Sequence, residues 1–336
     1  MKAALFLCGL VLLSETWALP QYRASLVDAP SGTVFNSMNS SGVLVGQRET
    51  ATGRDGIIRK PNGDILTVPT PSGYSGYHVF FTDINESGLI AGTLVHAFNN
   101  TGYGFVYDEV SGFQIMNSDP NEAIASTSMT DDGLMAFTYS AGGGLWNPST
   151  NEFTSIPRHG LESAVSGSRA AGWDWSWHNG EFTQLQGIGT KYAQSVSSAG
   201  IVAGYKFVNA RLTAVIWDQA GREIFVDSST EYQSGLWSLD GLGNAVGARQ
   251  LSSGEYYGTY FSPTSGSINV NSLIVNQDFQ GTLGSVAHLE DNGMAYGRSE
   301  VNGEFRTVLL TPVPEPGTML ALGAGLAALL RRKRTI

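Results

Sequence analysis

The sequence predicts an all-β fold, a seven-bladed β-propeller of four-stranded blades in which an N-terminal strand completes the last blade. Three observations predict it: a motif recurs seven times, its copies follow one another at about 42 residues, and each unit holds four short strand-forming runs. The motif reads polar-x-x-Gly-x-x-x-Gly, and its last position falls at residues 46, 92, 137, 172, 204, 247 and 297. Propeller blades repeat at this interval, whereas leucine-rich repeats are far shorter.

Five copies of the motif carry both glycines, and two are degenerate. Thr130–Phe137 lacks the second glycine, and Val165–Gly172 has Ser168 in place of the first. Each copy predicts a tight hairpin between the first two strands of a blade, because glycine adopts positive φ readily and the first polar side chain can bond its own backbone.

The second unit shows the four strands of a blade most clearly. Its β-branched and aromatic runs are separated by Asn, Gly, Ser and Asp, and they are His78–Ile84, Leu89–Val95, Gly104–Asp108 and Phe113–Asn117. The third strand of most units ends in a large residue, and these residues are Tyr107, Trp146, Trp177, Trp217 and Phe261. We expect these large side chains to pack in the core between blades.

The two ends of the repeat region predict how the ring closes. The seventh unit supplies only three strands, Ser285–Leu289, Met294–Arg298 and Phe305–Leu310. Near the N-terminus, Arg23–Pro30 resembles the fourth-strand segments Ile65–Pro69 and Phe153–Pro157. We therefore expect the N-terminal segment to complete the last blade, which removes open sheet edges without a disulfide.

The N-terminus has the pattern of a secretory signal peptide. Met1 and Lys2 form a positive start, residues 3–13 are apolar, and Thr16-Trp17-Ala18 is a small-x-small site, so we expect cleavage after Ala18 by the general secretion route. The only cysteine, Cys8, lies in this segment. The mature chain can therefore form no disulfide and has no thiol nucleophile.

The C-terminal tail has three parts in a fixed order. Pro312 to Pro316 is a stiff, proline-rich stretch, residues 318–330 are uncharged and apolar, and the basic end is Arg331, Arg332, Lys333 and Arg334. Basic residues after an apolar run are retained on the cytoplasmic side, so the tail predicts a short transmembrane segment with the body of the protein outside. The alternative is a plain membrane anchor behind a proline-rich linker.

This tail resembles the PEP-CTERM sorting signal of Gram-negative bacteria, and Pro314, Glu315 and Pro316 match its tripeptide. The resemblance implies processing by an exosortase near the tripeptide, after export across the inner membrane to the cell envelope, the outer surface or the medium. The repeats also loosely resemble HAF-type repeats of exported bacterial proteins, best in Thr213–Asp218. The chain then divides into a signal peptide (1–18), a propeller (19–311) and a sorting tail (312–336).

The composition restricts the partners of the body. The net charge is −10, and it is more negative without the four basic residues of the tail. An acidic surface repels phosphate backbones, which argues against nucleic acid as a partner.

Catalytic signatures are missing from the sequence. It contains no Gly-x-Ser-x-Gly, no His-Glu-x-x-His and no phosphate-binding loop, and its five histidines share no ligand spacing. We therefore expect no catalytic residues, no metal and no cofactor. The alternative is a propeller-type glycoside hydrolase or lyase, whose carboxylates would converge at the channel mouth only in the folded chain.

Several aromatic residues are predicted near the loops that bind ligands in propellers. Tyr74, Tyr77, Trp173 and Trp175 lie near the ends of strands on the face where the fourth strand of one blade leads to the next blade. Such rings can stack on sugars, although Trp175 could equally pack between blades beside Trp177. The sequence thus predicts an exported, non-catalytic surface or matrix propeller that associates with exopolysaccharide.

Overall fold

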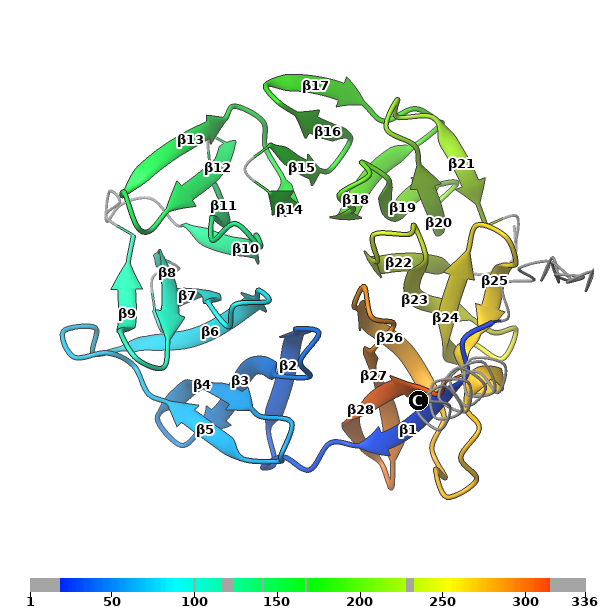
Figure 1. Cartoon of the computed structure of the whole chain (residues 1–336), viewed down its shortest axis with the longest axis horizontal. Helices are drawn as coiled ribbons and strands as arrows, with labels where there is room; N and C mark the ends of the chain where they lie inside the picture. The colour runs from blue at the N-terminus through cyan, green and yellow to red at the C-terminus, as the bar shows by residue number, and fades with distance from the viewer. Residues whose placement is uncertain are drawn as a thin grey trace, which may run out of the picture.

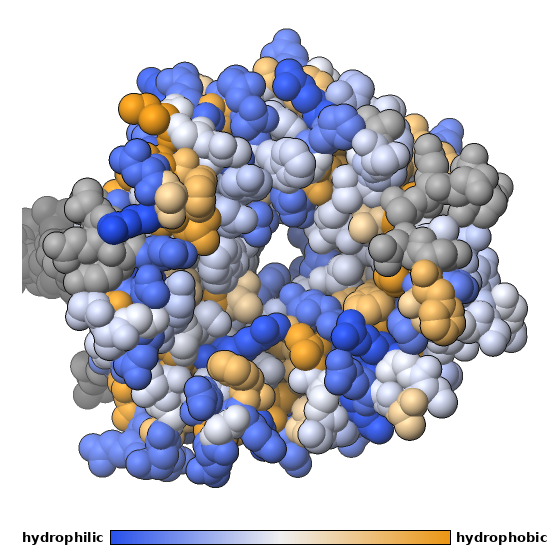
Figure 2. Space-filling model, turned by 180° about the vertical axis from the view of Figure 1, so that it is seen from behind, coloured by the Kyte–Doolittle hydropathy of each residue, from blue (hydrophilic) through white to orange (hydrophobic). Residues whose placement is uncertain are grey.

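A computed structural model describes residues 19–98, 101–116, 124–140, 142–166, 168–227 and 233–314. Seven four-stranded antiparallel sheets form a ring, which confirms the predicted seven-bladed β-propeller (Figure 1). Figure 2 shows an open hole at the centre of the ring. The predicted signal peptide, its cleavage site at Ala18 and the tail from Glu315 onward lie outside the described residues.

Each blade uses its strands in chain order from the channel outward. The first three blades are β2 (Thr33–Met38), β3 (Leu44–Thr50), β4 (Gly53–Arg59) and β5 (Ile65–Val68); β6 (Tyr77–Ile84), β7 (Ile90–His96), β8 (Gly102–Asp108) and β9 (Gly112–Ile115); and β10 (Ala125–Met129), β11 (Met135–Tyr139), β12 (Gly142–Asn147) and β13 (Glu152–Ile156). The next three are β14 (Leu161–Ser166), β15 (Arg169–Gly172), β16 (Trp175–His178) and β17 (Glu181–Gln184); β18 (Thr190–Val196), β19 (Val202–Val208), β20 (Arg211–Trp217) and β21 (Glu223–Val226); and β22 (Ser234–Leu239), β23 (Ala245–Gln250), β24 (Tyr256–Ser262) and β25 (Gly266–Asn269).

The seventh blade contains both ends of the described chain. It follows the short 3₁₀ helix η1 (Val270–Leu273) and consists of β26 (Leu283–Leu289), β27 (Ala295–Val301), β28 (Glu304–Pro312) and β1 (Tyr22–Leu26). Strand β1 pairs antiparallel with β28, and Figure 1 shows the two side by side. The predicted closure by the N-terminal strand is confirmed.

Strand β1 is held along both edges. On its outer edge, the Asn276 side chain accepts a hydrogen bond from the Ala24 amide at 2.7 Å and donates one to the Ala24 carbonyl at 3.0 Å. Tyr22 and Ala24 point into the core of the blade and are 1% and 4% exposed. The strand that closes the ring therefore has its outermost backbone groups covered by a side chain, which protects the edge from pairing with another chain.

The recurring motif forms the hairpin between the first two strands of a blade. In blade two the Asn85 side chain accepts from the Leu89 amide at 2.9 Å, and Gly88 has a φ of 86°. In blade five a Cβ on Gly204 would overlap the carbonyl oxygen of Tyr192, at a bulge of the innermost strand. The first glycine is thus required by its dihedral angle and the second by close backbone approach.

Neighbouring blades are joined by hydrogen bonds between their innermost strands. At three of these joints the residue that follows the bulge accepts from a backbone amide of the next blade: Asp83 from Met129 at 2.7 Å, Ser128 from Ala164 at 2.9 Å, and Ser238 from Leu289 at 3.2 Å. The large residues at the ends of the third strands are buried between these joints, as predicted, with Trp146 and Trp217 fully inaccessible. A polar ring at the channel and an apolar layer outside it therefore hold the blades together.

Candidate functional site

The loop face of the ring carries the loops from each fourth strand to the next blade and the turns between second and third strands. Trp173 directly follows β15 on this face and is 47% exposed. Other large apolar side chains of this face are also exposed, namely Phe98, Ile188, Phe207, Tyr256 and Phe305. Single exposed apolar side chains are common, so a site of recognition is indicated only where such side chains lie in contact with one another.

An aromatic strip crosses the loop face from blade four to blade six. It consists of Trp173, Tyr192, Tyr205 and Trp237, whose successive ring centroids are 6.1, 5.1 and 5.8 Å apart. Tyr192 and Tyr205 are cross-strand partners in β18 and β19, and their rings are stacked. The outer two contacts of the strip are edge to face, and Tyr192, Tyr205 and Trp237 are half-buried, so Trp173 is the most exposed ring of the strip on which a sugar can stack.

Local backbone contacts fix the position of Trp173. Its indole lies against Gly160, where a Cβ would overlap the ring and where φ is 68°. Its carbonyl accepts from the Ala193 amide of the next blade at 2.9 Å. Trp173 is therefore held by two blades although nearly half of its side chain is exposed.

Two other side chains of this site come from bulges in the innermost strands. The register of β14 shifts between Leu161 and Ser163, and that of β22 shifts between Leu236 and Ser238, so Glu162 and Trp237 are left without a strand partner. A bulge re-aims the side chain that it carries. The bulge therefore lets the innermost strands present Glu162 and Trp237 at the site instead of packing them between blades.

Glu162 supplies the charge of the site. Its Oε1 accepts a hydrogen bond from the Trp173 indole at 3.1 Å, which is its one hydrogen bond among the described residues. Burial raises the pKa of Glu162, and the hydrogen bond from Trp173 opposes this shift. Burial and then the charge of Glu162 raise the pKa of Tyr205, so the carboxylate lies within electrostatic range of the strip.

Tyr74 and Tyr77 belong to a separate group on blade two. Both rings pack against Tyr103, with centroids 5.6 Å away in each case, and Tyr77 also meets His96 at 4.8 Å. The three tyrosines are half-buried and line the edge of the blade-two core. The structure does not bring Tyr74 and Tyr77 together with Trp173.

Trp175 is not available for stacking on a ligand. It is 1% exposed, packs in the core of blade four and donates its indole N–H to the carbonyl of His159 at 3.1 Å. Its expected place among the ligand-binding aromatics is therefore wrong, because Trp175 is the first residue of β16 and points inward, whereas Trp173 lies in the turn between β15 and β16. Trp177, 8% exposed, also has the core role that the sequence allowed.

Glu162, Tyr205 and Trp237 belong to the site and were not predicted. One sequence signal could have found two of them, because each bulge residue stands ten positions before the last position of its motif copy. This rule gives Asn36, Thr82, Thr127, Glu162, Gln194, Trp237 and Ala287. Tyr205 could have been found only as the cross-strand partner of Tyr192.

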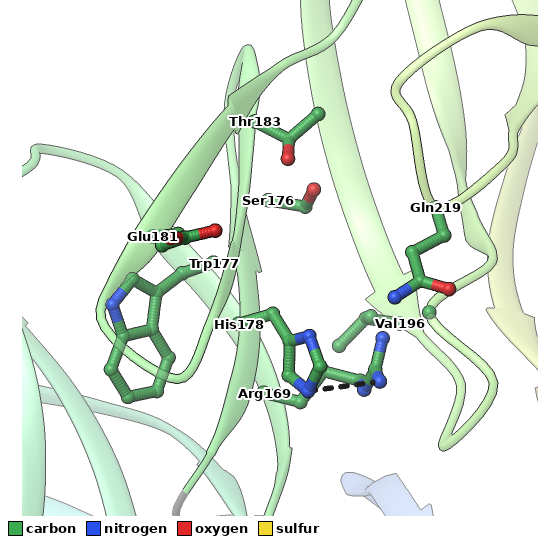
Figure 3. A pocket seen from close by; sticks show the side chains of 9 residues that line it. Arg169, Ser176, Trp177, His178, Glu181, Thr183, Val196 and Gln219 are labelled. Carbon is green, nitrogen blue, oxygen red and sulfur yellow. Dashed lines mark hydrogen bonds between the residues drawn. The ribbon is translucent and has the colours of Figure 1, made fainter.

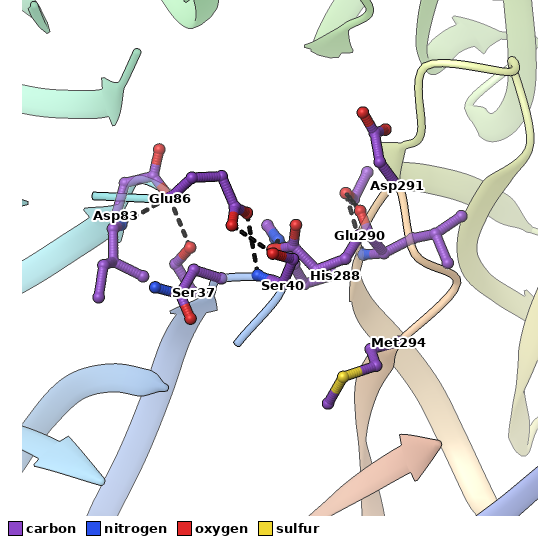
Figure 4. A network of polar contacts seen from close by, with 12 residues as sticks. Ser37, Ser40, Asp83, Glu86, His288, Glu290, Asp291 and Met294 are labelled. Atoms are coloured by element: carbon purple, nitrogen blue, oxygen red, sulfur yellow. Dashed lines mark hydrogen bonds and ion pairs between the residues drawn. The ribbon is translucent and has the colours of Figure 1, made fainter. Parts of the chain in front are cut away.

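Carboxylates gather on the opposite face, at the hairpins around the channel. Figure 4 shows Asp83, Glu86 and Asp291 in this network. Glu86 accepts from the Ser40 amide at 2.9 Å, and Asp291 accepts from the Gly241 amide at 2.6 Å, so each joins two neighbouring blades. Burial raises the pKa of Asp83, although its bonds from Ser37 and the Met129 amide oppose the shift. These carboxylates therefore serve as inter-blade acceptors.

A small polar pocket lies between blades four and five on the same hairpin face (Figure 3). It encloses about 120 Å³ and is lined by Arg169, His178, Glu181 and Gln219, among others. The Arg169 guanidinium donates to His178 Nε2 at 3.3 Å. The pocket is too small for a sugar ring and its substituents, since ligand pockets usually exceed about 300 Å³.

Within the described ranges, no three His, Cys, Asp or Glu side chains are grouped as a metal site requires. The same residues contain no helix with the length and hydropathy to cross a membrane. The predicted span at 318–330 and the basic end at Arg331, Arg332, Lys333 and Arg334 fall beyond the part of the chain that the structure describes.

The chain has a β-propeller fold, and solved structures of proteins with different functions have the same fold. A chain of the mitotic checkpoint complex is 12% identical with a TM-score of 0.58, over 88% of this chain and 92% of that one. A streptogramin B lyase is 9% identical with a TM-score of 0.50, over 87% and 98%. A prolyl endopeptidase is 12% identical with a TM-score of 0.54, over 88% and 51%. At such low identity these similarities show the fold alone.

The tail identifies the route of the protein. A family model described as the PEP-CTERM protein-sorting motif matches residues 312–334, so the chain carries this sorting signal, which indicates export and sorting by an exosortase. The motif directs the protein to the cell envelope or outer surface. No curated protein matches the chain. The model covers only the tail, so the resemblance of the blades to HAF-type repeats stays a prediction.

Proposed function

We propose that this chain is a non-catalytic propeller of the cell envelope whose loop face binds exopolysaccharide. The observation that carries the proposal is the aromatic strip, which runs over three blades and begins at Trp173 with 47% of its surface exposed. A rigid row of rings suits a repeating sugar polymer, because successive residues of the polymer can contact successive rings. Many weak contacts along one polymer then add by avidity.

The arrangement of the carboxylates supports a binding role over catalysis. A glycosidase needs two carboxyl groups on either side of the bond that it cleaves. Glu162 has one hydrogen-bond partner among the described residues, the Trp173 indole, and no second carboxylate contacts it there. On the opposite face, Glu86 and Asp291 are engaged by backbone amides of neighbouring blades. These contacts favour structural and binding roles for the acidic groups.

The proposal predicts that Trp173→Ala weakens retention on extracted exopolysaccharide. We expect retention of the full chain, purified in mild detergent, to fall about tenfold, because one aromatic stacking contact contributes roughly 1 kcal/mol or more. The melting temperature should change by no more than a few degrees, since the indole is half-exposed.

Phe153→Ala is the matched control for this prediction. Phe153 is also 47% exposed, but it lies on β13, the outermost strand of blade three, away from the strip. Its replacement should leave retention unchanged. Equal retention by the wild-type chain and the Trp173→Ala variant, with both folded, would contradict the proposed site.

A further inference from the structure

The aromatic strip carries a negative charge that no basic residue in the described part of the chain neutralises. Among the described residues the only partner of Glu162 is the Trp173 indole N–H, which contacts one of the two carboxylate oxygens. No ion pair joins Glu162 to any lysine, arginine or histidine in that part of the chain. A half-buried carboxylate without a cation is unusual, because buried charges are normally paired.

The two lysines that adjoin Tyr192 and Tyr205 in the sequence are engaged elsewhere, and Arg158, near Glu162 in the sequence, lies over the Phe182 ring at 5.1 Å. Lys191 donates to the carbonyls of Gly187 and Gly189, both at 3.1 Å. Lys206 is 7% exposed and pairs with Glu223 at 2.6 Å. The folded chain therefore holds these two cations away from Glu162, and the second oxygen of the carboxylate remains available.

The groups around Glu162 are those that bind ammonium ions. Trp173 contacts the carboxylate directly, and Tyr205 lies within range of its charge. An ammonium group is attracted to the faces of Trp and Tyr rings as well as to a carboxylate. A neutral sugar can donate hydroxyl hydrogen bonds to the carboxylate, but it leaves the charge of Glu162 uncompensated.

We infer that Glu162 and the aromatic strip form a subsite for a sugar that carries a free amino group, so that the polysaccharide bound by the loop face contains unacetylated amino sugars. This inference rests on the proposed function and specifies its ligand. The sugar ring stacks on Trp173 or Tyr192, and its ammonium group binds the second oxygen of the Glu162 carboxylate, whose first oxygen accepts from the Trp173 indole. N-acetylation removes the positive charge and with it the contact to Glu162.

The test measures binding of two glycans to the full chain, purified in mild detergent. The probes are an oligomer of glucosamine and an oligomer of N-acetylglucosamine of the same length, at low salt. We expect the glucosamine oligomer to bind about tenfold more tightly, because a charge-assisted hydrogen bond and a cation–π contact are added. High salt should abolish this preference in the unmodified chain, a readout that does not depend on any variant folding.

Two matched variants assign the preference to Glu162. Glu162→Gln keeps an oxygen that accepts from the Trp173 indole but removes the charge, so the two oligomers should bind equally. Asp174→Asn removes one negative charge from the turn that holds Trp173, where the Asp174 carboxylate accepts a hydrogen bond from Gln184. In this variant the preference for the glucosamine oligomer should persist. Equal loss in both variants would overturn the inference in favour of a general effect of net charge.

The remaining outcomes separate this inference from the proposed function. Equal binding of the two oligomers by the wild-type chain, with exopolysaccharide retention intact, would overturn the ammonium subsite and leave polysaccharide binding standing. If neither oligomer binds and the chain is not retained on exopolysaccharide, both the ammonium subsite and the proposed polysaccharide binding are overturned. An oligolysine peptide that competes as well as the glucosamine oligomer would overturn the assignment to a sugar.

Discussion

A chain that lacks residues 19–30 should melt about 10 °C or more below the intact protein. The deletion removes β1, whose buried Tyr22 and Ala24 complete the core of blade seven, and it exposes the edge of β28. Loss of one large buried aromatic residue alone costs about 3–5 kcal/mol, and total stabilities are about 5–15 kcal/mol. For a chain of this size each kcal/mol lowers the melting temperature by somewhat less than about 2 °C, and the lost pairing of β1 with β28 and the lost burial of Val27 add to the cost of the deletion.

Thermal unfolding followed by circular dichroism measures this loss. The matched control is Arg23→Ala with Ser25→Ala, which alters the exposed side of the same strand and should leave the melting temperature unchanged within a few degrees. An unaltered melting curve after deletion of 19–30 would show that β1 is not needed to close the ring.

Replacing Pro314, Glu315 and Pro316 with three alanines should stop processing of the protein. The tripeptide lies within the matched sorting motif at 312–334, so an exosortase should no longer recognise it. We expect an uncleaved precursor in the inner membrane, whereas the wild-type chain reaches the envelope surface. Cell fractionation with detection of the body of the protein distinguishes the two forms by size and by location.

A conservative change of the basic end controls for damage to the tail. Lysines in place of Arg331, Arg332 and Arg334 keep the positive charge that orients a membrane segment, so sorting should be normal. If the tri-alanine variant is also cleaved and delivered as usual, the tripeptide is not the recognition element.

The fold was predictable because each repeat encodes its own hairpin. Asn85 and Gly88 form the turn from within one eight-residue segment, so a local pattern was sufficient. The position of β1 followed from counting strands in the last unit, since a closed ring leaves no strand unpaired. These features depend on short-range geometry or on strand number, and both can be read from a sequence.

The candidate site was only partly predictable because it depends on contacts between blades. Trp173 and Trp175 are two apart in the sequence, and one is half-exposed while the other is buried. Their spacing alone could not distinguish them, because the turn after β15 re-aims the first. Glu162 was missed because a bulge turns its side chain toward Trp173, and the alternation of residues in a strand does not show a bulge; only its place ten residues before Gly172 marks it.

The central claim is that the loop face of this exported propeller binds exopolysaccharide through the aromatic strip. Hydroxyl-radical footprinting of the wild-type chain, with and without the polysaccharide, tests it most directly because it needs no substitution. Trp173 and Phe153 are equally exposed in the free protein. Oxidation of Trp173 therefore reports on the aromatic strip, and oxidation of Phe153 reports on the outer edge of blade three. The account predicts that the polysaccharide protects Trp173 from oxidation and leaves Phe153 unchanged. Protection of neither residue, or of Phe153 alone, would contradict it.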